Sequence, residues 1–205
     1  MDIQYKRWEK FYSAGNALSK DRWLENYENY FRPGTAVLDL GCGNGSNISY
    51  LMSKSADIHA CDYSESAVRQ VMETFGVKAV KADFRDGLPF PDSFFDIVVS
   101  DLSLHYFSRE ETAEIVAEIE RITKHSGIVL ARLNSVHDQN FGAGEGIELE
   151  QNFYDINGDR KRFFDREMID FFFGSSFSIL DAEEKKTDKY RKTKHVWEIV
   201  LKRGS

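Results

Sequence analysis

A short apolar run leads directly into three alternate glycines, and this junction constrains the fold more than any other feature. Residues 36–40 read Ala-Val-Leu-Asp-Leu, which predicts a buried strand, and glycines follow at Gly41, Gly43 and Gly45. Glycine has no Cβ, so a ligand can approach the backbone of such a turn closely. Apolar spacing after the turn predicts a helix. A glycine-rich turn between a strand and a helix is where α/β proteins hold nucleotide-like cofactors.

The residues around the turn indicate which type of cofactor it can bind. The dinucleotide pattern G-x-G-x-x-G/A requires a glycine or alanine at position 46, where this chain has Ser46. Asp39 lies just before the turn. Its carboxylate suits a ligand with hydroxyl or ammonium groups and would repel a pyrophosphate. The turn therefore argues against a nicotinamide dinucleotide.

The sequence VLDLGCGNG at residues 37–45 resembles the first motif of class I S-adenosylmethionine-dependent methyltransferases. The resemblance implies that Asp39 and the three glycines contact the cofactor. Asp62 ends a predicted strand about 20 residues past the glycines, where a carboxylate can accept both ribose hydroxyls. The resemblance also implies that Tyr63 packs on the adenosine. Asp62 alone could equally be a turn or cap residue.

Two later segments match the same family. A predicted strand ends at Asp83 and Phe84, which by resemblance meet the adenine; the alternative is a loop aspartate and a core phenylalanine. Residues 88–100 resemble the run into the family's fourth strand, and Ser100 at its end is assigned to the cofactor site.

The resemblance places the methyl acceptor just past this fourth strand. His105 is the candidate catalytic base because its pKa lies near neutrality, although a packed histidine explains it as well. Arg132, at the end of the fifth strand, is the other candidate and could hold an anionic acceptor; a surface salt bridge is the alternative. Tyr106 and Asn134 are candidate substrate contacts.

Two segments lie outside the expected scaffold. Residues 1–31 carry aromatic residues at helical spacing, which predicts a helical lid with Tyr12 at the substrate, or a helix simply packed on the body. Residues 134–162 form a long connection that we expect to cap the acceptor pocket, with Tyr154 as a contact. This region also loosely resembles a bacterial tellurite-resistance-like subgroup of small-molecule methyltransferases.

The order of elements predicts an α/β protein with a single domain over residues 1–205. Residues 177–182 and 196–201 both look like strands and should pair as an antiparallel hairpin. The expected architecture is a three-layer, Rossmann-like methyltransferase fold. Its seven-stranded sheet is mostly parallel and has this antiparallel hairpin at the C-terminus.

The charge and composition of the chain limit the classes of partner that it is expected to bind. A net charge of −7 disfavours nucleic acid, and no apolar run approaches the length of a membrane span. Two cysteines give neither a disulfide framework nor a metal site. We therefore expect a cytoplasmic monomer or homodimer without metal, nucleic acid or membrane partners.

The sequence thus predicts an S-adenosylmethionine-dependent methyltransferase acting on a small molecule, such as a thiol, a chalcogen oxyanion or another metabolite. Two alternatives stay open. One is a non-catalytic regulator of the same fold that binds S-adenosylmethionine or a nucleoside. The other is an NAD-type oxidoreductase, against which Ser46 and the terminal hairpin both argue.

Overall fold

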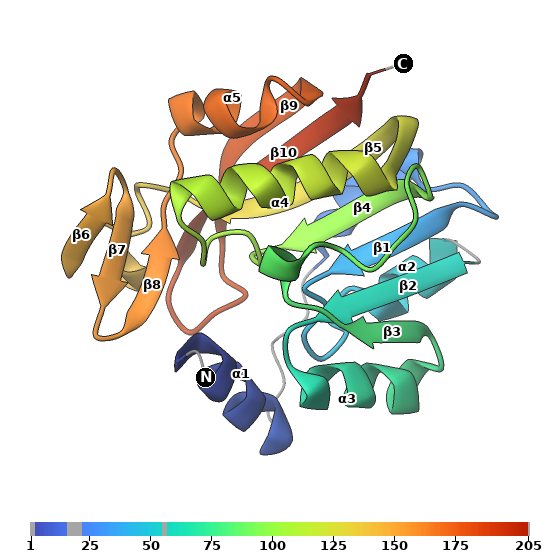
Figure 1. Cartoon of the computed structure of the whole chain (residues 1–205), viewed down its shortest axis with the longest axis horizontal. Helices are drawn as coiled ribbons and strands as arrows, with labels where there is room; N and C mark the ends of the chain where they lie inside the picture. The colour runs from blue at the N-terminus through green and yellow to red at the C-terminus, as the bar shows by residue number, and fades with distance from the viewer. Residues whose placement is uncertain (1–2, 16–21, 55–56, 205) are drawn as a thin grey trace.

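A seven-stranded sheet forms the centre of the molecule (Figure 1). The computed structural model describes residues 3–15, 22–54 and 57–204. The strands follow the order β3–β2–β1–β4–β5–β10–β9, and every pairing is parallel except those of β10 with its two neighbours. The strands are β1 (Ala36–Leu40), β2 (Asp57–Asp62), β3 (Lys78–Lys81), β4 (Phe95–Asp101), β5 (Thr123–Asn134), β9 (Phe177–Thr187) and β10 (Lys194–Arg203). The predicted mostly parallel sheet with an antiparallel C-terminal hairpin is confirmed.

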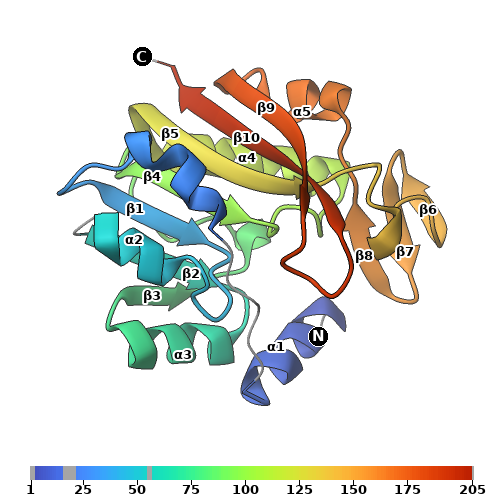
Figure 2. The same ribbon diagram turned by 180° about the vertical axis from the view of Figure 1, so that it is seen from behind.

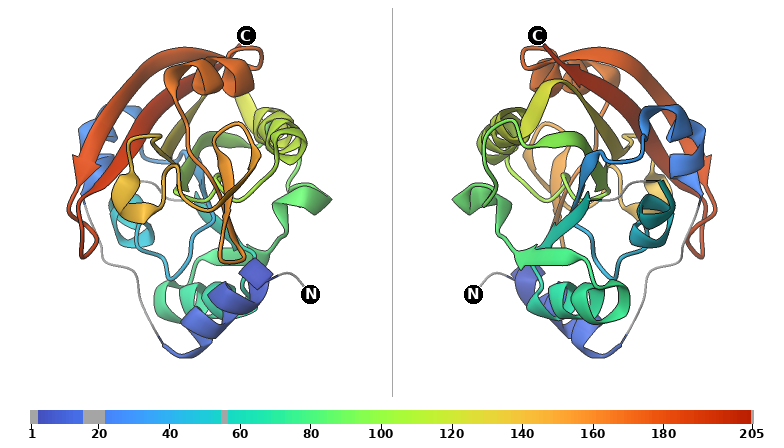
Figure 3. Two further views of the ribbon diagram at one scale, coloured as in Figure 1. Left: turned by 90° about the vertical axis from the view of Figure 1, so that its left-hand side faces the viewer. Right: turned by 90° about the vertical axis from the view of Figure 1, so that its right-hand side faces the viewer.

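Helices cover both faces of the sheet (Figures 1 and 2). They are α1 (Ile3–Ser13), η1 (Trp23–Tyr30), α2 (Ile48–Lys54), α3 (Glu65–Phe75), η2 (Phe84–Asp86), α4 (Arg109–Ile122), η3 (Gln139–Phe141) and α5 (Arg166–Phe173). Helices α4 and α5 lie on one face, η1 and α2 lie on the other, and α3 packs near the β3 edge, with α1 beside it (Figure 3). None of the helices in the described ranges is both long enough and apolar enough to cross a bilayer.

The central strands explain why the site lies at one edge. All five residues of β1 are buried, as expected for a parallel strand covered on both faces. Parallel pairing of β1 with β2 and β4 brings the carboxyl ends of these strands together. The glycine turn and Asp62 therefore meet at the same edge of the sheet.

Local sequence sets the helix ends around this edge. The side chain of Ser64 accepts a hydrogen bond from the backbone N–H of Ala67, and α3 ends at Gly76 in the left-handed conformation. Ser108 and Glu111 form a capping box at the start of α4.

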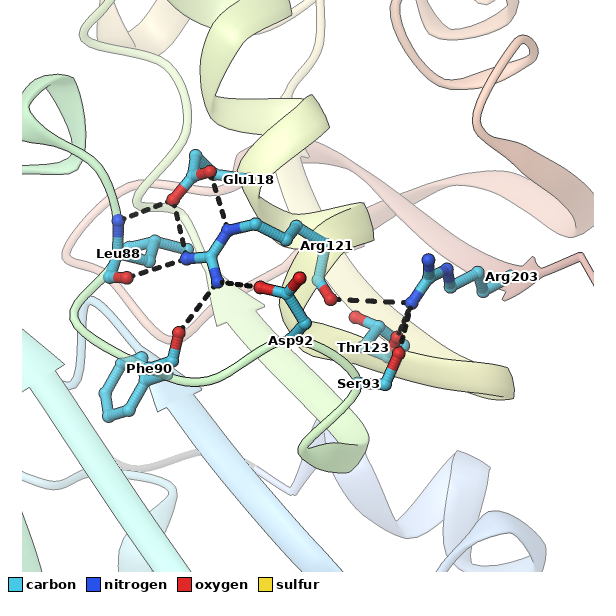
Figure 4. Close-up of polar contacts among 8 residues, drawn as sticks. All are labelled: Leu88, Phe90, Asp92, Ser93, Glu118, Arg121, Thr123 and Arg203. Carbon is cyan, nitrogen blue, oxygen red and sulfur yellow. Dashed lines mark hydrogen bonds and ion pairs between the residues drawn. The ribbon is translucent and has the colours of Figure 1, made fainter.

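A cluster of polar contacts fastens the loop that enters β4 (Figure 4). Arg121 on α4 donates to the backbone oxygens of Leu88 and Phe90, both at 2.8 Å. Glu118 accepts from the backbone N–H of Leu88 at 2.8 Å and from Arg121 at the same distance. These bonds anchor the start of the strand whose far end carries the site.

The terminal hairpin is longer than predicted. Residues 183–187 and 194–195 also belong to β9 and β10, beyond the predicted strands at residues 177–182 and 196–201. Edge strands tolerate charged side chains because one face meets solvent. The connection shrinks to the hairpin tip, residues 188–193, which reaches the functional edge.

The long connection predicted at residues 134–162 is also more ordered than expected. It contains a three-stranded antiparallel sheet of β6 (Ile147–Glu150), β7 (Phe153–Ile156) and β8 (Asp159–Arg162). Asn157 and Gly158 turn between β7 and β8 with φ angles of 57° and 85°. Asn-Gly is a strong signal for a tight hairpin turn, and it was missed in the sequence.

Candidate functional site

A cavity of about 640 Å³ opens at the carboxyl ends of β1, β2 and β4. Helix α1 and the hairpin tip contribute further walls. Most of the residues predicted from the sequence line it: Tyr12, Gly41, Gly43, Asp62, Tyr63, Asp83, Phe84, His105, Tyr106 and Asn134. The structure therefore gathers residues from both predicted halves of the site into one space.

The glycine turn leaves no room for side chains at two positions. A Cβ on Gly43 would lie 2.5 Å from the hydroxyl oxygen of Tyr12, and one on Gly41 would lie 2.3 Å from the Cβ of Ser103. Both glycines have positive φ angles, +51° and +79° respectively. A Cβ on Gly45 would instead meet Phe75, and Gly45 does not line the cavity. Its role is helix packing rather than direct ligand contact.

Asp62 lines the cavity and is hydrogen-bonded to the glycine turn. Its two carboxylate oxygens accept hydrogen bonds from the backbone N–H groups of Gly43 and Ser64, both at 2.9 Å. Burial raises the pKa of Asp62, and these backbone hydrogen bonds oppose the rise. A carboxylate has about four acceptor positions. The backbone of Gly43, Ser64 and Tyr63 does not use all of them, which leaves acceptor capacity for a ligand hydroxyl.

Tyr63, Asp83 and Arg85 form one connected wall. Arg85 donates to the Asp83 carboxylate at 2.7 and 2.9 Å and to the Tyr63 hydroxyl at 3.2 Å. Burial raises the pKa of Asp83, but the hydrogen bonds from Arg85 outweigh it and leave the pKa lowered. The Arg85 guanidinium lies 5.7 Å from the Tyr63 ring centroid. Arg85 also lines the cavity and was not predicted.

Asp39 and Ser100 lie beneath the cavity rather than in its wall. Both are fully buried, and both reach it through a neighbour. Asn47 donates to Asp39 Oδ1 at 3.4 Å, while the hydroxyls of Ser100 and Ser103 are 2.7 Å apart. Burial raises the pKa of Asp39 to about 7, and its Oδ2 has no hydrogen-bond partner among the described residues.

The position of Arg132 fits neither interpretation of the sequence, a contact to an anionic acceptor or a surface salt bridge. Its side chain is 1% exposed, so the surface salt bridge is wrong, and it does not line the cavity. Its guanidinium makes a two-pronged contact with Asp101, with both N–O distances at 2.7 Å. Lys189 from the hairpin tip binds the same carboxylate at 3.0 Å. Burial raises the pKa of Asp101, but Arg132 and Lys189 bring it down to about 2.

His105 is buried in the cavity wall and 5% exposed. Its Nδ1 has no hydrogen-bond partner within the described part of the chain. Burial and the nearby cations Lys194, Lys161 and Arg7 lower the pKa of His105 well below its usual value. The imidazole is therefore neutral at physiological pH and can accept a hydrogen bond.

Tyr154 does not line the cavity. It lies on β7, where its ring centroid is 6.1 Å from that of Phe163. Within residues 134–162 the cavity contacts are Asn134, Phe141 and Lys161 instead. The hairpin tip and the start of β10 add Lys189, Tyr190 and Lys194, which sequence reasoning passed over as a charged connection.

Only part of the predicted lid over residues 1–31 lies at the site. Helix α1 lines the cavity, and Glu9 fastens it to α3 by accepting from the Ser64 hydroxyl at 2.6 Å. Element η1 instead buries Trp23 and Tyr27 against the sheet. Residues 1–2 and 16–21 of the predicted lid lie outside the described residues.

Comparison with known proteins gives a consistent family. Residues 38–131 match the family model described as a methyltransferase domain. A malonyl-[acyl-carrier protein] O-methyltransferase from Herminiimonas arsenicoxydans is 33% identical over 132 residues, 63% of this chain and 46% of that protein. The human mitochondrial arginine-hydroxylase NDUFAF5 is 34% identical over 99 residues, 47% of this chain and 28% of that protein. The chain thus spans less than half the length of these relatives.

Structural similarity extends over most of the chain. A crystal structure titled as a SAM-dependent methyltransferase from Methanosarcina mazei aligns with a TM-score of 0.73 at 16% identity. The alignment covers 87% of this chain and 97% of the other. At this identity the likeness bears on the fold alone.

Proposed function

We propose that the chain, whose residues 38–131 match the methyltransferase-domain family model, is a class I S-adenosylmethionine-dependent methyltransferase that binds S-adenosylmethionine in this cavity and methylates a small molecule. The observation that carries the proposal is the contact of Asp62 with the glycine turn. It places a carboxylate with spare acceptor capacity beside a backbone that a ligand can approach.

The residues present fit this cofactor. The carboxyl of Asp39 is buried beneath the turn with an Oδ2 unpartnered among the described residues, and a cationic ligand above it would favour its ionised form. Tyr63, Phe84 and Arg85 offer flat surfaces for a planar base. Asp62 would hold the ribose and Asp83 the adenine edge.

S-adenosylmethionine supplies a methyl group that its sulfonium already activates. The protein's contribution is then mainly to hold the two reactants in line and to exclude water. Tyr12 and Tyr106 wall the cavity, and we infer that the neutral imidazole of His105 in the same wall accepts the acceptor's proton. Arg132 positions Asp101 from behind and does not face the acceptor.

The acceptor is a metabolite-sized molecule in this proposal, because α1 and the hairpin tip both wall the cavity. The relative named as an O-methyltransferase supports an oxygen acceptor. The thiol and chalcogen-oxyanion acceptors, and the tellurite-resistance-like subgroup, stay predictions from the sequence.

Transfer from S-adenosylmethionine with an isotopically labelled methyl group to a metabolite extract tests the proposal. We expect S-adenosylhomocysteine and a labelled product with the wild-type chain. Gly43→Val should abolish both because its side chain would meet Tyr12 in the ligand's space. Gly34→Val is the matched control, since Gly34 shares a positive φ angle, +85°, but has open space around its Cβ position.

Cofactor binding without a labelled product would favour the non-catalytic regulator. Binding of NADH in place of S-adenosylmethionine would favour the oxidoreductase. Normal transfer by a folded Gly43→Val variant would show that the turn is not the cofactor site.

We propose further that α1 acts as the lid over both ligands. Amide exchange in α1 should slow when S-adenosylhomocysteine is added, and slow more than in α4, because cavity occupants contact α1 directly. The cap role of residues 134–162 predicts slower exchange around Phe141 and Lys161 as well. Unchanged exchange at all these positions would contradict the lid.

A further inference from the structure

The cavity wall beyond His105 has a charge opposite to that of the whole protein. The chain carries a net charge of −7. Yet four cationic side chains line this part of the cavity: Arg7, Lys161, Lys189 and Lys194. Among the described lining residues of this part, only Asp101 is acidic, while Asp62 and Asp83 belong to the cofactor side.

One carboxylate serves two of these cations. Asp159 on β8 accepts from Arg7 on α1 and also pairs with Lys161 at 3.0 Å. Asp159 does not line the cavity, whereas both of its partners do. The Lys161 side chain is 20% exposed, so its charge is only partly solvated. This group has one positive charge in excess at the cavity wall.

A second carboxylate repeats the arrangement. Asp101 binds both Arg132 and Lys189, and all three side chains are almost fully buried. Lys194 is balanced by Asp138, with an N–O distance of 2.5 Å. At the cavity wall, Asp159 and Asp138 therefore pair with three cations: Arg7, Lys161 and Lys194. This excess of positive charge at a partly enclosed wall favours a site completed by an anion.

The positive charge at this wall also acts on His105. The cations Lys194, Lys161 and Arg7 line the same cavity and add to burial in lowering its pKa. Its Nδ1 is buried and unpartnered in the described structure.

Aromatic side chains surround the cations. Lys194 Nζ lies 4.4 Å from the Phe141 ring centroid, and the Phe141 and Tyr190 centroids are 5.5 Å apart. Tyr106 closes the wall next to His105. This combination suits a molecule with an anionic head and an apolar body.

We propose that the methyl acceptor is an organic anion, a carboxylate or phosphate monoester, whose charged group is held by Lys161 with Arg7 and Lys194. Its apolar body lies against Tyr106, Phe141 and Tyr190. This inference rests on the proposed function because it assigns the acceptor half of the same cavity. The anionic group anchors the molecule, and Lys161 and Lys194 determine specificity.

Calorimetry on the chain loaded with S-adenosylhomocysteine tests the anchor without requiring turnover. The probes are octanoate, octyl phosphate and octanamide. Octanoate or octyl phosphate should bind, and the neutral amide should bind at least about tenfold more weakly, since it loses a charge-assisted hydrogen bond. The two anions show whether the site prefers carboxylate or phosphate.

Lys161→Gln should weaken anion binding about tenfold, because Arg7 alone then balances Asp159 and the excess charge disappears. Lys186→Gln, at an exposed position on β9 of the C-terminal hairpin, should leave it unchanged. Equal binding of amide and anions, no binding of either anion, or no effect of Lys161→Gln would overturn the inference. Failure of S-adenosylhomocysteine itself to bind would instead reject the proposed function.

Discussion

Asp62→Ala should weaken binding of S-adenosylmethionine by roughly 30-fold to 1,000-fold. The variant removes a carboxylate that would accept two ribose hydroxyls, a loss of about 2–4 kcal/mol. It also removes the acceptor for the Gly43 N–H, so the turn loses one of its hydrogen bonds to β2. Isothermal titration calorimetry measures the effect, and circular dichroism checks that the variant is folded.

A control lies at the opposite end of the same strand. Asp57 opens β2, is partly exposed and pairs with Lys78 at 3.1 Å, away from the cavity. Asp57→Ala should therefore keep the wild-type affinity within about twofold. Wild-type affinity in a folded Asp62→Ala variant would remove Asp62 from the cofactor site.

The second large effect concerns stability. Asp101→Asn should lower the free energy of unfolding by about 3–5 kcal/mol, because it leaves Arg132 and Lys189 buried without their counter-charge. For a chain of this size this corresponds to a fall in Tm of roughly 10 °C. Asp92→Asn is the control, since the Asp92 side chain is 78% exposed and its pair with Arg121 is worth at most about 1 kcal/mol.

The stability difference should also depend on pH in a defined direction. The pKa of Asp101 is lowered to about 2 in the folded chain, below its value of about 3.9 in an unfolded chain. The stabilisation by its charge is therefore complete above pH 4 or so and is lost as the pH falls toward about 2. Thermal unfolding should show a constant gap between wild type and Asp101→Asn near neutrality and a narrowing gap below about pH 4. A gap that widens in acid would contradict the ion-pair account.

The cofactor side of the site was predictable from sequence because its signals are local. Glycines at alternate positions and an acid at a strand end each depend on a few neighbouring residues. Parallel pairing then brings Gly43 and Asp62 together. Asp39 and Ser100 were assigned to the same region, but their burial makes them second-layer supports, which no local pattern indicates.

The acceptor side depends on contacts between distant segments. Lys161 comes from β8 and Lys189 from the hairpin tip, and nothing in the sequence places them near His105. Arg132 was misassigned because its partner Asp101 lies on the neighbouring strand. Tyr154 was misplaced because the Asn157–Gly158 turn, which folds residues 147–162 into a sheet, was not used.

Titration of the wild-type chain with S-adenosylmethionine, alone and in the presence of excess NADH, tests the central claim most directly. We expect one molecule of S-adenosylmethionine per chain, with an affinity that NADH does not change, because Ser46 and Asp39 disfavour a dinucleotide pyrophosphate at the turn. Absence of S-adenosylmethionine binding, or its displacement by NADH, would contradict the account.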